Sequence, residues 1–258
     1  MSLNMVNLLY EQTLRDEAGK KAARGPRKPH HYPSSACAIV KGKFEGKCRR
    51  ATWFEWKGRE PTDPMDAPAL FKTNTGNLIH GQLNDVLARA LEGLGYGRGS
   101  EEVEFHWVPE GLKYEFSGRM DNVFVHDGVR YKAEWKSTYG RGADFIKRDG
   151  PKMENLLQCL IYLEQPEVPA DHVVLLYAAR DSGYVFGYLV SKDPAGLLVE
   201  HMNSSKVEVA PVTMGGVVSA TSMLEEYLGG DVPPPKDFHG TWQCDYCSFR
   251  KLCDKTGE

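Results

Sequence analysis

The stretch "GRMDNVFVHDGVRYKAEWKS", residues 118–137, predicts a β-hairpin and thereby decides the fold. Alternating β-forming side chains lie on both sides of Asp127-Gly128, and this pair favours a two-residue turn that requires positive φ. With such a turn, His126 pairs with Val129, and every later pair follows from that one. The hairpin therefore fixes which side chains of its two strands face each other.

Three charged side chains come together in this register. Asp121 lies directly opposite Glu134, with the two Cβ atoms about 4.5–5.5 Å apart, and Lys136 points to the same side of the sheet. Opposed carboxylates repel each other. A bound Mg²⁺ or Mn²⁺ ion would offset that repulsion, since carboxylate oxygens and water are the ligands that these ions prefer. Lys136 beside the ion could orient water and stabilise charge on a phosphate. The alternative is an exposed strand face on which Lys136 simply pairs with the two acids.

Helices and further strands surround the predicted hairpin. Apolar residues at helical spacing, or β-branched and aromatic runs bounded by Gly, Asp and Pro, identify them. The predicted helices cover residues 4–22, 48–56, 75–94, 151–165 and 216–230, and "TDPMDAP" at 62–68 is predicted as a loop. The predicted strands cover residues 101–109, 113–127, 129–137, 172–181 and 183–191. The order of these elements describes an α/β (α+β) fold in which helices cover a central sheet.

The composition is that of a globular protein whose charge is unevenly distributed. The 258 residues, 41% of them hydrophobic, can form one large domain or a domain with an appendage. Residues 1–60 contain 13 Lys and Arg against 6 Asp and Glu, whereas the remainder contains 19 against 29. The basic end could follow a phosphate backbone or form a solvated surface. Since neither an apolar run of about 18 residues nor a signal peptide occurs, we expect a cytoplasmic protein of a bacterial, archaeal or phage-infected cell, without a membrane partner.

The C-terminal segment "CDYCSFRKLC", residues 244–253, contains three of the six cysteines. Without a secretion signal, such thiols are typical of a metal site rather than of disulfides. Thiolates select zinc or an iron–sulfur cluster, and both usually need a fourth ligand. Cys37 is one candidate for it, and His239 is another, which would make a Cys3His zinc site. Cys159 lies within a predicted helix and is expected to be a packed small residue.

Together these motifs resemble the PD-(D/E)xK nuclease superfamily, and most closely its RecB-like exonucleases of the AddB and CRISPR-associated types. The resemblance extends from about residue 30 to residue 253 and implies a restriction-endonuclease-like fold with a central mixed sheet flanked by helices. The catalytic residues that it implies are Asp121, Glu134, Lys136, and Gln158 and Tyr162 of a Q-x-x-x-Y motif. The implied ligands of Mg²⁺ or Mn²⁺ are His80, Asp121, Glu134 and the main-chain carbonyl of Trp135.

The cysteine segment matches the C-terminal trio of the iron–sulfur members of that family, in which a distant N-terminal Cys completes a 4Fe-4S cluster. Here "KCRRATWFEW" resembles the family's C-P-R-K-plus-aromatic helix, with Arg49 in place of the usual proline. Such a cluster would join the N- and C-terminal regions in one subdomain. It would close a loop of roughly 200 residues and stabilise the fold by about 4–5 kcal/mol on entropic grounds. The implied ligands are Cys48, Cys244, Cys247 and Cys253, with Cys37 as the alternative to Cys48.

The resemblance implies a metal-dependent DNA exonuclease that prefers single-stranded ends and acts in phage recombination, DNA processing or CRISPR adaptation. Residues 1–74 would form an N-terminal helical region that contributes one cluster cysteine, 75–232 the nuclease core, and 233–258 the cysteine tail. The partners would be DNA, a second copy of the chain, or recombination or CRISPR-adaptation proteins. Two alternatives stay open: a non-catalytic nucleic-acid-binding or assembly module with this fold, and a zinc-tail endonuclease.

Overall fold

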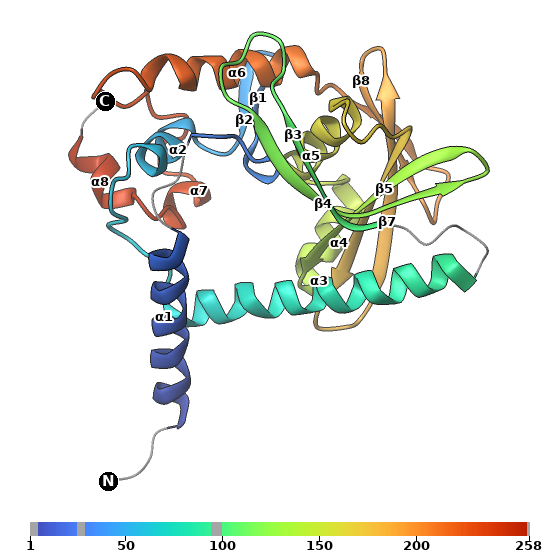
Figure 1. Cartoon of the computed structure of the whole chain (residues 1–258), viewed down its shortest axis with the longest axis horizontal. Helices are drawn as coiled ribbons and strands as arrows, with labels where there is room; N and C mark the ends of the chain where they lie inside the picture. The colour runs from blue at the N-terminus through green and yellow to red at the C-terminus, as the bar shows by residue number, and fades with distance from the viewer. Residues whose placement is uncertain (1–4, 25–28, 94–99, 257–258) are drawn as a thin grey trace.

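A seven-stranded mixed sheet forms the centre of the computed structural model, which describes residues 5–24, 29–93 and 100–256 (Figure 1). The strands, in their order across the sheet, are β3 (Ser100–Trp107), β4 (Phe116–His126), β5 (Val129–Thr138), β6 (His172–Ala179), β7 (Val185–Asp193), β8 (Gly196–His201) and β9 (Val207–Ala210). Neighbours β5 and β6 are parallel, and the other adjacent strands are antiparallel. The prediction of an α/β fold with a central mixed sheet is therefore confirmed.

Strands β8 and β9, and a separate antiparallel pair formed by β1 (Cys37–Val40) and β2 (Lys43–Gly46), are absent from the predicted strands. Each is four to six residues long, too short for alternation to distinguish a strand from a turn. The turn between β1 and β2 is made by Lys41 and Gly42, which have φ of 49° and 77°. This small sheet packs against α6 (Met214–Tyr227).

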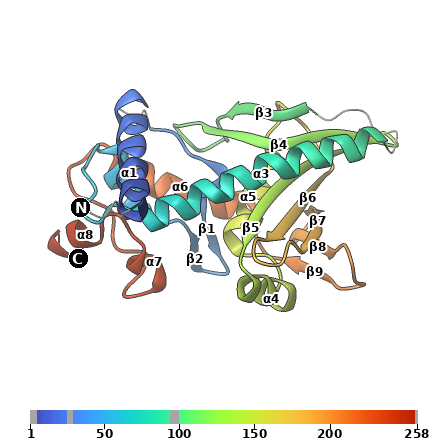
Figure 2. The same cartoon turned by 90° about the horizontal axis from the view of Figure 1, so that it is seen from below.

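Helices flank the central sheet (Figures 1 and 2). Of the α-helices, α3 (Ala67–Gly93), α4 (Gly140–Asp149) and α5 (Met153–Glu164) contact it directly. The other helices of the described ranges are α1 (Met5–Arg24), α2 (Arg49–Trp56), α6, α7 (Trp242–Asp245), α8 (Arg250–Lys255) and the 3-10 helix η1 (Pro33–Ser35). The predicted helices correspond to α1, α2, α3, α5 and α6. Among the helices of the described ranges, none is long and apolar enough to cross a membrane.

Helix α3 begins before its predicted start, within the segment 62–68 that the sequence predicts as a loop. Asp66 caps the helix, because its carboxylate accepts a hydrogen bond of 2.9 Å from the N–H of Ala69. Pro68 stands in the first turn, where a missing N–H costs no helical hydrogen bond. The proline that suggested a loop therefore belongs to the helix start. The predicted end at Leu94 lies outside the described residues.

Helix α4 is missing from the predicted helices because its first turn contains Gly140 and Gly142, which usually weaken helices. Tertiary contacts explain both glycines. Gly140 N–H donates a hydrogen bond of 2.9 Å to Asp181, and a Cβ atom on Gly142 would lie 2.4 Å from the hydroxyl oxygen of Thr138. Helices α4 and α5 then form the crossover that the parallel strands β5 and β6 need.

Helix α5 is buried along nearly its whole length, because it contacts the sheet as well as η1, β1 and β2. Its stretch "NLLQCLIYL", residues 155–163, is apolar around most of the helix, as expected for a helix enclosed on several sides. Cys159 is fully buried there, which confirms its predicted role as a packed small residue. The same packing places Gln158 beside β5.

The N- and C-terminal parts of the chain pack against each other around α2 (Figure 1). Trp53 and Phe54 of α2 contact Leu224 of α6 and Phe249, which precedes α8. The predicted boundary between residues 74 and 75 falls within α3. The division into three regions stays a prediction.

Candidate active site and thiol cavity

The hairpin of β4 and β5 has the predicted register. The paired residues are Asn122–Ala133, Val123–Lys132, Phe124–Tyr131, Val125–Arg130 and His126–Val129. Beyond the Asn122–Ala133 pair, away from the turn, Asp121 Oδ2 accepts a hydrogen bond of 2.8 Å from the main-chain N–H of Trp135. Asp121 therefore lies beside Glu134, as the register requires.

Burial and the neighbouring carboxylate change the protonation of Asp121. Removal from water is the largest cause, the charge of Glu134 adds to it, and together they raise the pKa of Asp121 to about 7. The N–H of Trp135 and the ammonium group of Lys136 act in the opposite direction. The two acids are thus close enough to compete for a positive charge.

Glu134, Lys136, Gln158 and Tyr162 form one chain of hydrogen bonds. Lys136 Nζ donates to Glu134 Oε1 at 2.6 Å and to Gln158 Oε1 at 2.7 Å. Gln158 Nε2 donates to the hydroxyl of Tyr162 at 2.7 Å. That hydroxyl donates to the main-chain carbonyl of Arg119 at 3.1 Å. These contacts bring together the predicted catalytic residues of β5 and α5.

Lys136 keeps its positive charge and reaches solvent. Burial alone would lower the pKa of its ammonium group, but the charges of Glu134 and Asp121 raise that pKa above its ordinary value. The side chain of Lys136 is 22% exposed, whereas Tyr162 is 1% exposed and its pKa is raised by burial. Lys136 can therefore contact a bound phosphate, and Tyr162 can act only through Gln158 and β4.

His80 lies on α3 beside the same strand. One turn earlier, a Cβ atom on Gly76 would lie 3.2 Å from the hydroxyl oxygen of Ser137, so α3 passes close to β5 there (Figure 2). Burial and the charge of Lys136 lower the pKa of His80, while Glu134 acts in the opposite direction. The imidazole is thereby kept neutral, which is the form that binds metal ions.

The donor set of this site fits a hard divalent ion, because Mg²⁺ and Mn²⁺ accept oxygen and nitrogen ligands of these kinds. The predicted ligands are the carboxylates of Asp121 and Glu134, the imidazole of His80 and the carbonyl of Trp135. Within the part of the chain that the structure describes, no three His, Cys, Asp or Glu side chains lie close enough together to hold an ion as they stand. The carboxylate of Glu134 is turned toward Lys136 instead.

A cavity of about 170 Å³ lies between α2 and the C-terminal segment. All four predicted cluster ligands line it: Cys48, Cys244, Cys247 and Cys253. The volume exceeds the roughly 10–15 Å³ that one water molecule needs, so the cavity has room for a group larger than a single ion. His239 lines it as well. Cys37 lines a separate cavity with Thr221, and burial raises the pKa of its thiol to about 12.

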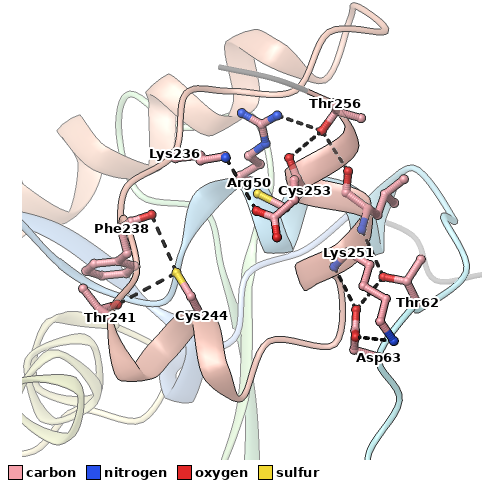
Figure 3. A network of polar contacts seen from close by, with 12 residues as sticks. Arg50, Thr62, Asp63, Lys236, Phe238, Thr241, Cys244, Lys251, Cys253 and Thr256 are labelled. Atoms are coloured by element: carbon pink, nitrogen blue, oxygen red, sulfur yellow. Dashed lines mark hydrogen bonds and ion pairs between the residues drawn. The ribbon is translucent and has the colours of Figure 1, made fainter.

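Polar contacts hold the C-terminal segment around this thiol cavity (Figure 3). Arg50 of α2 donates a hydrogen bond of 2.8 Å to the hydroxyl of Thr256, and Lys236 lies 3.7 Å from Asp254. Burial raises the pKa of the Cys253 thiol, and the positive charges of Arg50 and Lys236 counteract that effect. These two cations therefore favour the thiolate form that binds metals.

Tyr139, Arg180 and Lys72 border the site and are missing from the predicted site residues. Tyr139 follows β5 and Arg180 follows β6, and parallel neighbours end at the same edge of a sheet. The parallel pairing of β5 and β6 was therefore the missing signal, because it places Arg180 near the end of β5 that carries Lys136. Arg180 Nη1 donates to the main-chain carbonyl of Lys72 at 3.0 Å, which ties α3 to this edge.

The chain thus has a mixed α/β fold, an acidic site with a lysine on a β-hairpin, and a separate thiol cavity. It is similar to the protein in the crystal structure of SSO0001, which it matches over 98% of both chains with a TM-score of 0.56 and 16% sequence identity. At that identity the similarity shows the fold alone. No protein-family model matches the chain, and no curated protein matches it.

Proposed function

We propose that this protein is a metal-dependent DNA exonuclease of the RecB-like type, with a restriction-endonuclease-like fold and a preference for single-stranded ends. The observation that carries the proposal is the hairpin, in which Asp121 lies beside Glu134 and Lys136 contacts both Glu134 and Gln158. Two acids side by side on a sheet repel each other. A bound cation would offset this repulsion, and a cation-binding site therefore explains the arrangement better than an exposed strand face does.

Mg²⁺ or Mn²⁺ held by Asp121, Glu134, His80 and the Trp135 carbonyl would supply Lewis-acid activation of the phosphodiester. Asp121 must lose its proton before it can act as a ligand. Because the pKa of Asp121 is about 7, it does so near neutral pH. Glu134 would serve both as a ligand of the ion and as the partner of Lys136, which donates to it at 2.6 Å.

Lys136 contributes a fixed positive charge beside the phosphate, where negative charge accumulates during hydrolysis. Gln158 orients the ammonium group by accepting its hydrogen bond. Tyr162 orients Gln158 from the core. Since these contacts exist before substrate binds, little reorganisation is needed at the moment of reaction. Lys136 is thus the group that touches substrate, and the other two are positioning residues.

The four cysteines of the thiol cavity would hold a 4Fe-4S cluster, a group that thiolate ligands select. It would connect Cys48 in the N-terminal region to the C-terminal segment and so form the predicted subdomain. The support for it is that thiols from these distant parts of the chain line one cavity. Zinc is the competing occupant, because His239 lines the same cavity.

A nuclease of this kind would process DNA ends in the cytoplasm, in phage recombination, DNA processing or CRISPR adaptation. Its partners would be proteins of those pathways or a second copy of the chain. The basic residues of the first 60 positions support DNA as the substrate, since Lys and Arg neutralise phosphates and release counterions.

The test compares nuclease activity of the wild type, Lys136→Ala and Lys192→Ala, all purified without oxygen. Lys192 is a matched control, because it also pairs with a glutamate (Glu164, 3.1 Å) but lies on β7. With Mn²⁺, the wild type and Lys192→Ala should degrade end-labelled single strands. Lys136→Ala should lose at least about 100-fold in kcat. A circular single strand should survive in every reaction.

Two other results would change the proposal. Equal digestion by Lys136→Ala and the wild type, or no digestion with either metal, would exclude the catalytic site and favour a nucleic-acid-binding module. Cleavage of the circle would identify an endonuclease. Analysis of iron and acid-labile sulfide tests the thiol cavity separately. A colourless protein with stoichiometric zinc would show that the cavity holds zinc in place of a cluster, and the nuclease proposal would remain.

A further inference from the structure

Tyr139 carries an exposed aromatic ring with two cations against it. It is the first residue after β5, and 46% of its surface is exposed. Lys72 Nζ of α3 lies 4.9 Å from the ring centre, and Arg180 Cζ lies 4.3 Å from it. Both are cation–π distances. The ring therefore has positive charges from two other elements close to it and still contacts solvent.

This ring lies close to the candidate active site. Tyr139 follows Lys136 by three residues, which is about 10 Å of extended chain. Arg180 follows β6, the parallel neighbour of β5, so both residues lie at the same edge of the sheet. The charge of Arg180 also reaches His80, whose pKa it helps to lower.

The protein itself does not neutralise these two cations. In the ranges 29–93 and 100–256, neither Lys72 nor Arg180 forms an ion pair with a carboxylate. Arg180 Nε is buried and lacks a hydrogen-bond partner in that part of the chain. Asp181, the nearest acid in sequence, accepts a hydrogen bond from Gly140 N–H. These two cations are therefore available to bind an anion from outside the protein.

A second ring extends this surface along α4. Tyr184, in the loop between β6 and β7, is 48% exposed, and Lys147 Nζ of α4 lies 3.7 Å from its ring centre. The hydrogen bond between Gly140 and Asp181 ties the start of α4 to the same loop. The two ring–cation groups thus occupy one region beside α4, at the end of the catalytic strand.

We propose that this surface binds the single-stranded DNA next to the scissile phosphate, with Tyr139 stacked on a base and Lys72 and Arg180 on the flanking phosphates. The inference rests on the proposed nuclease function and names residues that would bind its single-stranded substrate. Aromatic rings stack on any base, and cations follow the phosphate backbone. Bases inside a duplex are already stacked and paired, so the surface selects unpaired strands.

Binding of a fluorescein-labelled oligothymidylate in EDTA, measured by anisotropy, separates this surface from cleavage. Tyr139→Ala should weaken binding about tenfold or more. Tyr139→Phe should retain binding, whereas Tyr139→Leu should lose it despite a similar bulk. Arg180→Gln should weaken binding and reduce its salt dependence by about one phosphate contact. Tyr131→Ala, at the other end of β5, is the matched control and should bind like the wild type.

An oligomer that consists of abasic sugar-phosphates separates stacking from charge. The wild type should bind it as weakly as Tyr139→Ala binds the normal strand, and Tyr139→Ala should bind both alike. Circular dichroism shows whether each variant is folded, and Arg180→Gln keeps the test valid if Tyr139→Ala unfolds.

Three results would overturn the inference: normal binding of the oligothymidylate by Tyr139→Ala, an equal loss for Tyr139→Ala on the normal and the abasic strand, or no binding by the wild type. Its failure is distinguishable from failure of the nuclease proposal. Cleavage with normal binding by Tyr139→Ala refutes this surface only. Binding through Tyr139 by a wild type that never cleaves refutes the nuclease function only.

Discussion

The protonation of Asp121 depends on the groups that surround it on the hairpin. Its carboxylate is partly buried next to Glu134, where a second negative charge costs free energy. The N–H of Trp135 offsets only part of that cost. Asp121 therefore holds a proton up to about neutral pH and becomes a carboxylate above it, the form that would bind the proposed divalent ion.

The stability of the protein should depend on pH through Asp121. Its folded-state pKa of about 7 lies above the ordinary value of about 3.9, so between these pH values the folded protein binds more protons than the unfolded chain. In EDTA, wild-type stability should fall as pH rises through this window. Asp121→Asn lacks the ionisation and should be more stable than the wild type at about pH 8, by about 1–3 kcal/mol.

Urea unfolding at about pH 4 and pH 8 measures this difference. At the lower pH, Asp121→Asn and the wild type should be similarly stable, since both side chains are then neutral. Asp85→Asn, on an exposed turn of α3, is the control and should change neither value. If Asp121→Asn were less stable than the wild type at the higher pH, the charge of Asp121 would stabilise the folded state, which contradicts the prediction.

The hairpin could be predicted from sequence because its determinants are local. Asp127-Gly128 specifies the turn, and alternation then specifies that Asp121 lies beside Glu134. Helix α4 could not be predicted, because Gly142 is explained only by its approach to Thr138. The site residues on the hairpin could be predicted because the turn and the alternation are local. Those at the ends of β5 and β6 could not, because they depend on a strand pairing that no local pattern reveals.

The placement of α3 also lies beyond local patterns. Its apolar spacing identifies a helix, yet Leu78 and Val86 are 72% and 54% exposed. The buried positions include Gly76 and Asn84 instead. The helix meets β5 where it has no side chain, so the distance between His80 and the hairpin depends on a glycine.

Substitution of Gly76 should therefore move His80 away from the hairpin. In Gly76→Val the Cβ atom would lie 3.2 Å from the hydroxyl of Ser137, and the two methyl groups add further overlap. Affinity for Mn²⁺, measured by calorimetry, should fall about tenfold, the lower end of the loss expected when a ligand is misplaced. Gly81→Ala is the control, because its Cβ atom would meet nothing within 4 Å. That variant should bind Mn²⁺ normally and be more stable by up to about 1 kcal/mol. Equal affinities would show that α3 does not position a metal ligand.

The two ends of the chain are joined by more than the thiol cavity. Arg49 donates to Asp237 from its side chain at 2.9 and 2.5 Å and from its main-chain N–H at 2.7 Å. This largely buried ion pair fixes the start of α2 against the segment that leads to α7. It therefore keeps Cys48 on the same cavity as the C-terminal cysteines, without any contribution from a cluster.

Loss of the fourth ligand should release both the iron and part of the stability of the whole molecule. Cys48→Ser should contain less iron and lose visible absorption. It should also unfold at a lower urea concentration, with a free energy of unfolding reduced by at most about 4–5 kcal/mol on the loop-closure estimate. The effect should be smaller than that limit, because the pair of Arg49 and Asp237 still restrains the ends. Cys37→Ser is the control and should keep its iron, since Cys37 lines another cavity. The opposite result would make Cys37 the ligand, and loss of stoichiometric zinc in His239→Ala would make the site Cys3His.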